Sequence, residues 1–248
     1  MMGARAGVPA FALALMFALA CPSPALAQSA HGPSFQLEAA SDERRRGISW
    51  SGGDPVLRAS ASLPLTPTLT LDAAATSLWG SDRHSGADAV IDLGATFSRQ
   101  AGGWTLDAIG RYHLFPGASG DQGYGEIGAN AAFLIGPASM SLFAYYAPDQ
   151  SAIGGDNLYA GTAAAIGIPA TPFTLSAHIG RSSGSRDDPA RSRRLRPEGS
   201  YWDHGVALDY YRGRWSAGLR YAGSSIEGDT AAARHSGASL IARLGLSL

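Results

Sequence analysis

The chain has 248 residues, a formal net charge of −1 at neutral pH, 45% hydrophobic residues, 16% charged residues and 32 glycines. Because it lacks the overall basic field that attracts nucleic acid, we expect no nucleic-acid partner. After the N-terminal segment no apolar run approaches the ~20 residues of a membrane-spanning helix. The composition lies between those of a soluble domain and a helical membrane protein, as is typical of a membrane β-barrel.

The N-terminal segment has the order of a secretory signal peptide. Arg5 precedes an apolar run over residues 8–20, and small residues then lead to Ala27, after which we predict cleavage. The chain therefore divides into a signal peptide over residues 1–27 and a single outer-membrane β-barrel domain over residues 28–248. That domain has no cysteine, which excludes disulfide and thiolate chemistry.

Twelve segments with alternating apolar and polar side chains follow in chain order. In the segment 103–115, Trp104 and Tyr112 lie near the two ends of the apolar face, whereas Asp107 and Arg111 lie on the polar face. The predicted strands are 34–42, 55–64, 68–79, 88–99, 103–115, 124–135, 138–148, 157–168, 172–182, 201–212, 214–224 and 235–248. Their lengths suit the ~9–11 residues with which a tilted strand crosses the apolar layer.

The connections between these segments alternate between long and short. The short ones are LTPT, QAGG, GP, PATP and RG. Outer-membrane barrels have short periplasmic turns and long external loops, whereas a soluble sheet has no reason for such sorting. The sequence predicts an all-β fold: a closed antiparallel transmembrane β-barrel of about 12 strands in the outer membrane of a Gram-negative bacterium.

The two faces of the segments differ in charge. The apolar faces carry no charged residue, and a basic residue there near the midplane would cost ~2–4 kcal/mol. Burial of the opposite faces in a dry core would cost more still, so we expect them to line a hydrated lumen. The residues expected to line the pore are Arg58, Asp72, Asp92, Asp107, Arg111, Glu126, Arg220 and Arg243.

The signs of these charges are sorted by strand. The acidic residues fall on predicted strands three to six, and Arg58, Arg220 and Arg243 fall on strands two, eleven and twelve, which barrel closure makes neighbours. If the register allows, a field across the lumen would orient polar solutes. The alternative is that these residues pair across the interior and keep a narrow barrel solvated or closed.

Short motifs along the chain resemble those of the TorF family of porins. They are Arg46-Gly47-Ile48-Ser49, Gly53-Asp54-Pro55, Tyr112 with Phe115-Pro116-Gly117, Tyr124-Gly125-Glu126, Tyr145-Tyr146-Ala147-Pro148-Asp149 and Tyr201-Trp202-Asp203-His204. The resemblance implies a barrel of twelve or a similar number of strands that admits small solutes. Two features depart from the family pattern: Glu43-Arg44-Arg45 precedes the first motif, and the chain ends in Leu248 where barrels usually present phenylalanine to the barrel-assembly machinery.

Further candidate residues lie in the predicted loops and on one strand. Arginines that could bind lipopolysaccharide phosphates are Arg44, Arg45, Arg46, Arg186, Arg191, Arg193, Arg194 and Arg196, although a solvated loop explains them equally well. His178 most simply forms a hydrogen bond inside the lumen. No spacing of the loop aspartates makes a calcium loop, so no metal site is expected.

Together these features predict a passive channel for small polar solutes that contacts outer-membrane lipids, with no cofactor and no catalytic residue. One alternative is a structural barrel with a closed interior. Another is a lipid hydrolase with a Ser–His pair, for which the chain offers His84-Ser85 and His235-Ser236. The sequence leaves the solute and the oligomeric state open.

Overall fold

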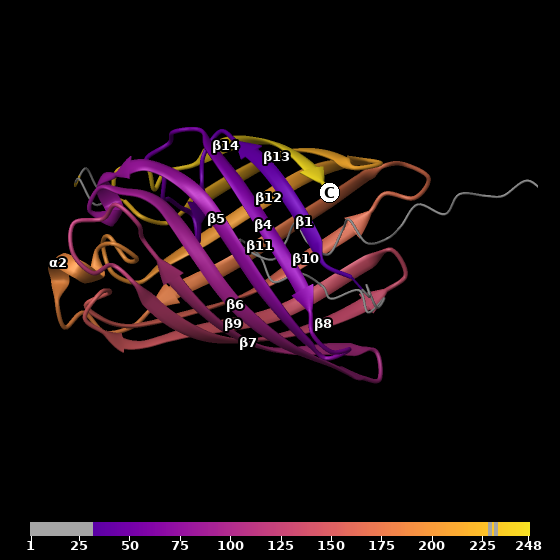
Figure 1. Ribbon diagram of the computed structural model, residues 1–248, viewed down its shortest axis with the longest axis horizontal. Coiled ribbons are helices and arrows are strands. Elements are labelled where there is room, and N and C mark those ends of the chain that lie inside the picture. The colour runs from indigo at the N-terminus through magenta and orange to yellow at the C-terminus, as the bar shows by residue number, and fades with distance from the viewer. Residues whose placement is uncertain (1–31, 228–229, 231–232) are drawn as a thin grey trace, which may run out of the picture.

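The alternating segments form the strands of a closed barrel. The computed structural model describes residues 32–227, 230 and 233–248, so the predicted signal peptide lies outside the described residues. Within the described part, twelve strands pair antiparallel with their chain neighbours, and β1 closes the barrel by pairing with both β4 and β14 (Figure 1). These strands are β1 (Ser34–Ala40), β4 (Val56–Pro64), β5 (Leu69–Ser81), β6 (Ala87–Ala101), β7 (Trp104–Leu114), β8 (Tyr124–Ile135), β9 (Ala138–Gln150), β10 (Gly155–Gly167), β11 (Phe173–Ser183), β12 (Tyr201–Arg212), β13 (Trp215–Ser224) and β14 (Ser239–Ser247).

The predicted fold class is confirmed. The largest difference in strand bounds is at the last strand, which was predicted from residue 235 and begins at Ser239. An even number of strands brings both ends of the barrel chain to one side, where the backbone N–H of Leu248 donates to the carbonyl of Phe35 (2.9 Å). Among the described residues, no helix is long and apolar enough to cross a membrane.

The two ends of the barrel differ in their connections. The short-turn end carries the links 65–68, 102–103, 136–137, 168–172 and 213–214, and the long-loop end carries 41–55, 82–86, 115–123, 151–154, 184–200 and, of the last link, the described residues 225–227, 230 and 233–238. In the tight link between β8 and β9, Gly136 has a φ of +57° and is followed by Pro137. This order suits a type II′ turn, whose twist matches the paired strands. Figure 1 shows the long-loop end at the left, marked by α2 (Pro189–Ser192).

The outer face of the barrel is apolar, and the inner face is polar. Large apolar side chains such as Leu57, Ile127 and Leu240 are more than 60% exposed on the outer face. Inward-facing positions on the same strands carry charges, as Arg58 and Glu126 show. A soluble protein buries such apolar side chains, so the arrangement suits a lipid environment outside the barrel.

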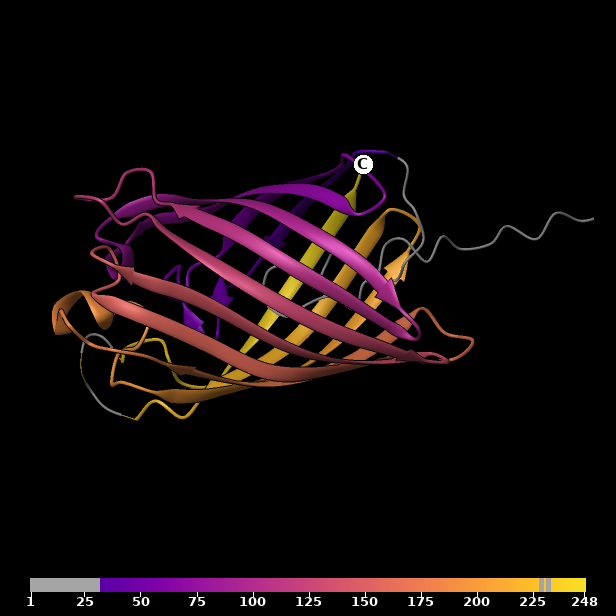
Figure 2. The same cartoon turned by 90° about the horizontal axis from the view of Figure 1, so that it is seen from below.

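Four short elements at the long-loop end were not predicted, and one of them is α2. The other three are the strands β2 (Arg44–Arg45) and β3 (Ile48–Ser49), which form a hairpin, and the 3₁₀ turn η1 (Asp82–His84). Figure 2 shows the hairpin, in purple, within the outline of the barrel. The connection after β1 was expected to be an external loop, but side-chain pairing with the barrel wall draws it inward.

Candidate functional site

The connection after β1, residues 41–55 and here called loop 1, folds into the long-loop end of the barrel. The β2–β3 hairpin turns at Arg46 and Gly47, whose φ angles are +51° and +76°. A Cβ atom at Gly47 would lie 2.7 Å from Cβ of Asp203 on β12, which is closer than real Cβ contacts. Glycine at this position therefore allows the tip of loop 1 to contact the barrel wall.

Arg45 anchors one side of loop 1 to the wall. Its guanidinium donates to both carboxylate oxygens of Asp92 on β6, at 3.0 and 2.8 Å, and to Glu43 at 2.7 Å. The guanidinium also lies 4.2 Å from the ring centroid of Trp50. Burial alone would lower the pKa of Arg45, but the two carboxylates outweigh it and raise the pKa, so the pair stays ionised.

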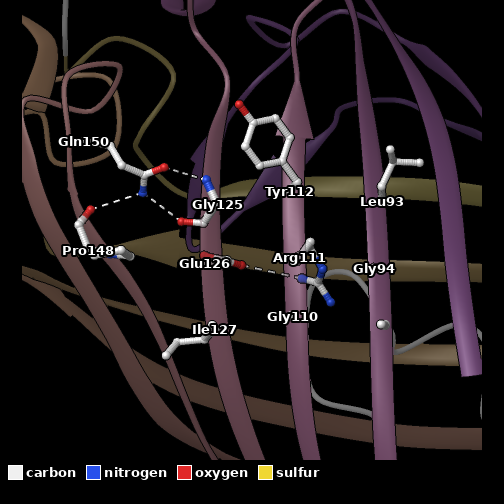
Figure 3. Close-up of a pocket in the computed structure, with 11 residues that line it drawn as sticks. Leu93, Gly94, Gly110, Arg111, Tyr112, Gly125, Glu126, Ile127, Pro148 and Gln150 are labelled. Atoms are coloured by element: carbon white, nitrogen blue, oxygen red, sulfur yellow. Dashed lines mark hydrogen bonds and ion pairs between the residues drawn. The ribbon is translucent and has the colours of Figure 1, made fainter. Parts of the chain in front are cut away.

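Arg46 anchors the other side of loop 1. Its guanidinium donates to Glu126 on β8 at 2.5 Å and lies 4.7 Å from the ring centroid of Tyr159. The Arg46 carbonyl accepts a hydrogen bond from the hydroxyl of Tyr201 (2.9 Å). Figure 3 shows that Arg111 on β7 also reaches Glu126, at 3.7 Å. Arg46 thus joins loop 1 to β8, β10 and β12.

His113 links these two anchors. Its Nδ1 lies 2.6 Å from Asp92 and its Nε2 lies 3.5 Å from Glu126. Close polar contacts therefore run from Arg45 through Asp92 and His113 to Glu126 and Arg46, and the contact between His113 and Glu126 is not a hydrogen bond. Such buried networks hold one arrangement firmly because loss of a single member leaves its partner unpaired.

Other long loops cover loop 1. Arg83 of η1 donates to the carbonyl of Ser49 (2.9 Å) and to that of Arg194 (3.3 Å). The Arg194 guanidinium lies 4.8 Å from the ring of Phe115 and 5.3 Å from that of Tyr124. The apolar cluster under these arginines comprises Trp50, Leu78, Ala87, Val90, Phe115, Tyr124, Ala147, Ala152, Ile153 and Leu195. We call loop 1, η1 and residues 184–200 together the plug.

Three of the arginines expected to be external lie inside this packing. Arg45, Arg194 and Arg196 are buried, so the expectation that they bind lipopolysaccharide or lie in a solvated loop is wrong for them. Arg196 instead donates to the carbonyl of Asp156 (2.8 Å). Burial lowers the pKa of Arg194 to about 10. Exposed arginines remain on the same loop, at Arg186, Arg191 and Arg193.

All eight residues predicted to line the pore lie on the inner face of the barrel, and many of their charges are paired with neighbouring groups. Asp92 and Glu126 pair with the plug, as described, and Arg243 pairs with Asp209 (2.8 Å) and Glu38 (3.9 Å). Arg58 donates to Thr76 (3.1 Å) and lies 3.9 Å from Glu43 of loop 1. Arg220 is buried on β13. Much of the charge predicted for a field across the lumen is therefore paired locally.

Asp72 and Asp107 have a different environment closer to the short-turn end. Asp72 accepts a hydrogen bond from Ser62 (2.8 Å), and Asp107 accepts from Ser98 (2.7 Å) and Asn130 (2.9 Å). These donors are uncharged, so they hold the carboxylates without neutralising them. The inner face near Asp72 and Asp107 therefore carries more negative charge than the net charge of the whole inner face would suggest.

A groove with a volume of about 570 Å³ lies on the outer face of the barrel, over strands β6 to β9. Leu93, Tyr112 and Ile127 rise around it, and Figure 3 shows Gln150 beside Gly125. Pro148 has no N–H to continue the pairing of β9 with β8. The Gln150 amide takes over by bonding both the N–H and the carbonyl of Gly125, each at 2.8 Å. On a surface that faces lipid, the backbone groups of Gly125 need these hydrogen bonds, because unpaired backbone groups are costly in lipid.

The residues that sequence reasoning missed are those of the plug. Trp50 was not assigned to a site. His84 was considered only for a Ser–His pair, and Arg46 only as an external-loop arginine that could bind lipopolysaccharide. A signal was nevertheless present, because the motifs containing Arg46, Tyr124 and Tyr201 are far apart in the sequence and converge here. Their convergence depends on the barrel register, which no single motif encodes.

Comparisons with known proteins agree with this architecture. A family model described as "Bacterial protein of unknown function (Gcw_chp)" matches residues 24–242. No curated protein matches the chain. The attribution to the TorF family, which rests on the motifs, stays a prediction.

Solved porin structures share the fold at low sequence identity. A NanC porin in a rhombohedral crystal form has a TM-score of 0.61 at 10% identity, covering 86% of this chain and 98% of its own. The KdgM porin has a TM-score of 0.56 at 9% identity, with 86% and 97% covered. A second KdgM structure, in complex with disordered oligogalacturonate, has a TM-score of 0.54 at 9% identity, with 87% and 96% covered.

Proposed function

The chain belongs to the Gcw_chp family of bacterial proteins of unknown function, and we propose that this member is an outer-membrane channel for passive diffusion of small polar solutes. The observation that carries the proposal is the sidedness of the barrel. Apolar residues such as Leu57 and Ile127 are exposed outside, whereas charged residues face inward. Water inside and lipid outside is the arrangement that stabilises such a barrel.

The path through the channel would run along the inner charges. We propose that Arg58, Asp72, Asp92, Asp107, Arg111, Glu126, Arg220 and Arg243 line it. Fixed charges on the wall of a narrow lumen orient and filter hydrated solutes without a binding pocket. The KdgM porin, which shares the fold, is described with oligogalacturonate, in keeping with a polar solute here.

The proposal includes export and a location. The segment 1–27 would direct the chain across the inner membrane, and the barrel-assembly machinery would insert it into the outer membrane. The exposed arginines of the long loops, Arg186, Arg191 and Arg193, would then face lipopolysaccharide phosphates.

Two measurements test the channel. Purified protein in planar bilayers should give stepwise conductance, and liposomes containing it should swell in small sugars and progressively less in larger ones. Matched liposomes without protein serve as the control. Absence of both conductance and swelling at pH 8 and at pH 5.5, with a correctly folded barrel, would contradict the channel.

A closed structural barrel is the second candidate, and the plug is the observation that favours it. A barrel that stays sealed by the plug would give neither conductance nor swelling. Removal of the plug anchor by Arg46→Ala would then create a conductance that the wild type lacks.

The lipid hydrolase has less support. Among the described residues, neither ring nitrogen of His84 has a hydrogen-bond partner, so it does not form the Ser–His pair that this chemistry needs. Phospholipid or lipid A hydrolysis by the purified protein, lost on replacing His84 or His235, would establish it.

A further inference from the structure

His84 is a fully buried histidine inside the plug. Its ring lies 4.5 Å from that of Trp50 in loop 1 and stacks on Phe115 at 4.6 Å between centroids. Its side chain has 0% relative exposure, and neither ring nitrogen has a hydrogen-bond partner among the described residues. A neutral imidazole fits this apolar slot, whereas an imidazolium would lose its hydration without gaining an acceptor.

The arginines that face His84 make protonation harder still, and a second histidine lies nearby. Arg194 approaches from residues 184–200, Arg83 from its own turn, Arg45 from loop 1, and His113 from β7. Tyr124 on β8 contributes an aromatic ring beside Phe115. Asp82, on the same turn as His84, is exposed.

The carboxylates on the strands behind this cluster are already engaged. Asp92 binds Arg45 and His113, and Glu126 binds Arg46. Burial, reinforced by the surrounding cations, lowers the pKa of His84 well below its ordinary value.

Displacing His84 would loosen loop 1. Arg83, the residue before it, holds the Ser49 carbonyl, and the hydroxyl of Ser81 donates to the Trp50 carbonyl at 2.6 Å. The ring of Trp50 in turn packs at a tilt against His84 and contacts Arg45. These contacts tie the 3₁₀ turn and loop 1 together at the barrel mouth.

We propose that loop 1 is a gate released by acid, with His84 as the proton sensor that is neutral when the plug is seated and charged when it is released. This inference rests on the proposed channel function and adds its regulation. Above pH ~6.5, the ordinary histidine value, both states are neutral at this residue, and the plug keeps its full stability. As the pH falls from there towards the lowered value of the seated state, only the released state binds the proton. The ratio of released to seated plug then rises about tenfold per pH unit.

Hydrogen exchange of residues 42–54 in the full-length protein tests the gate directly. Wild type and His84→Phe, which keeps an aromatic ring between Trp50 and Phe115, are compared at pH 8 and pH 5.5. The exchange rate of the wild type is divided by that of His84→Phe at the same pH, so the pH dependence of the intrinsic exchange rate cancels. We expect equal exchange at pH 8 and about tenfold faster exchange of the wild type at pH 5.5. His204→Phe, a change at an exposed histidine on the outer face, should behave as the wild type.

Two further measurements keep the outcomes distinct. In labelled wild-type protein, the chemical shift of the His84 imidazole should remain that of the neutral ring below pH 6.5. This measurement requires no variant. Bilayer conductance of the wild type should increase between pH 8 and pH 5.5, and that of His84→Phe should not.

Equal loop 1 exchange in wild type and His84→Phe at pH 5.5 would overturn the gate even if conductance is observed. Exchange that responds to acid in a protein without conductance at any pH would instead overturn the channel and leave the acid release of loop 1 standing.

Discussion

Arg45 and Asp92 illustrate how single residues decide whether the mouth of this barrel is filled. Their side chains are 47 positions apart in the chain and meet in a bidentate pair, with side-chain exposures of 8% and 4%. The net contribution of such a buried pair is small, because desolvation offsets the attraction. Loss of one partner is costly, because the other charge stays buried and unpaired.

A double-mutant cycle tests this account of the anchor. Arg45→Met should weaken the seated plug by about 3–5 kcal/mol, since Asp92 loses its partner. Arg45→Met with Asp92→Leu should recover much of that loss, because both charges are gone. Protease susceptibility of loop 1 reports the seated fraction. The pair does not act as an anchor if the double variant is cleaved as fast as the single one.

The acidic residues of the lumen should differ in their effect on selectivity. Sequence reasoning grouped Asp92 with Asp107, but Arg45 neutralises Asp92, whereas Asp72 and Asp107 accept only from uncharged donors in the hydrogen bonds described. A carboxylate ~8 Å from a passing cation in water contributes about 0.5 kcal/mol, or about twofold. Asp72→Asn with Asp107→Asn should therefore reduce the cation preference about fourfold at low salt.

Reversal potentials in a salt gradient measure this preference. Asp92→Asn is the informative control, because it should loosen loop 1 with little direct effect on selectivity. An unchanged reversal potential in the Asp72 and Asp107 double variant would refute their assignment to the path.

At the scale of elements, the strands could be predicted from sequence, whereas the plug could not. Alternation in a segment such as β7 reports which face meets lipid, and it depends only on residues two positions apart. The path of loop 1 depends on partners such as Asp92 and Tyr201, which only barrel closure brings within reach. The eight lumen residues were therefore placed on the correct face, while their pairing partners in the plug were missed.

The turn of the β2–β3 hairpin offers a test in which one element is altered and the barrel is kept. Gly47→Ala should dislodge the tip of loop 1, because the new Cβ would meet Asp203 at 2.7 Å in addition to the strain of a φ of +76°. Gly52→Ala is the matched control, since Gly52 has a φ of +73° but open space around its Cβ position. Hydrogen exchange of residues 42–54 should rise strongly for the first variant and weakly for the second. Equal effects would mean that backbone strain, and not contact with the wall, sets the position of the tip.

At the scale of the whole molecule, the barrel has an outer side that faces lipid and an inner side that faces water. Adjacent residues of one strand point to opposite sides, so each side can be tested by itself. On β7, Ala108 lies outside, midway between the exposed aromatics Trp104 and Tyr112. Its neighbour Asp107 faces inward and accepts from Ser98 on β6. Aromatic residues of this kind mark the two membrane interfaces, so Ala108 would lie near the bilayer midplane.

One charge placed on either side of this wall should have opposite consequences. Ala108→Arg should reduce the free energy of unfolding in lipid vesicles by about 2–4 kcal/mol, because its guanidinium would enter hydrocarbon. Ser98→Arg carries the same charge on the inner face, directly across from Asp107, where a carboxylate is available to pair with it. Urea titrations of both variants in the same vesicles measure the difference, since the unfolding free energy falls linearly with denaturant. An equal cost for the two arginines would mean that hydrocarbon does not surround this barrel, and the channel, its acid gate and its selectivity residues would all lose their premise.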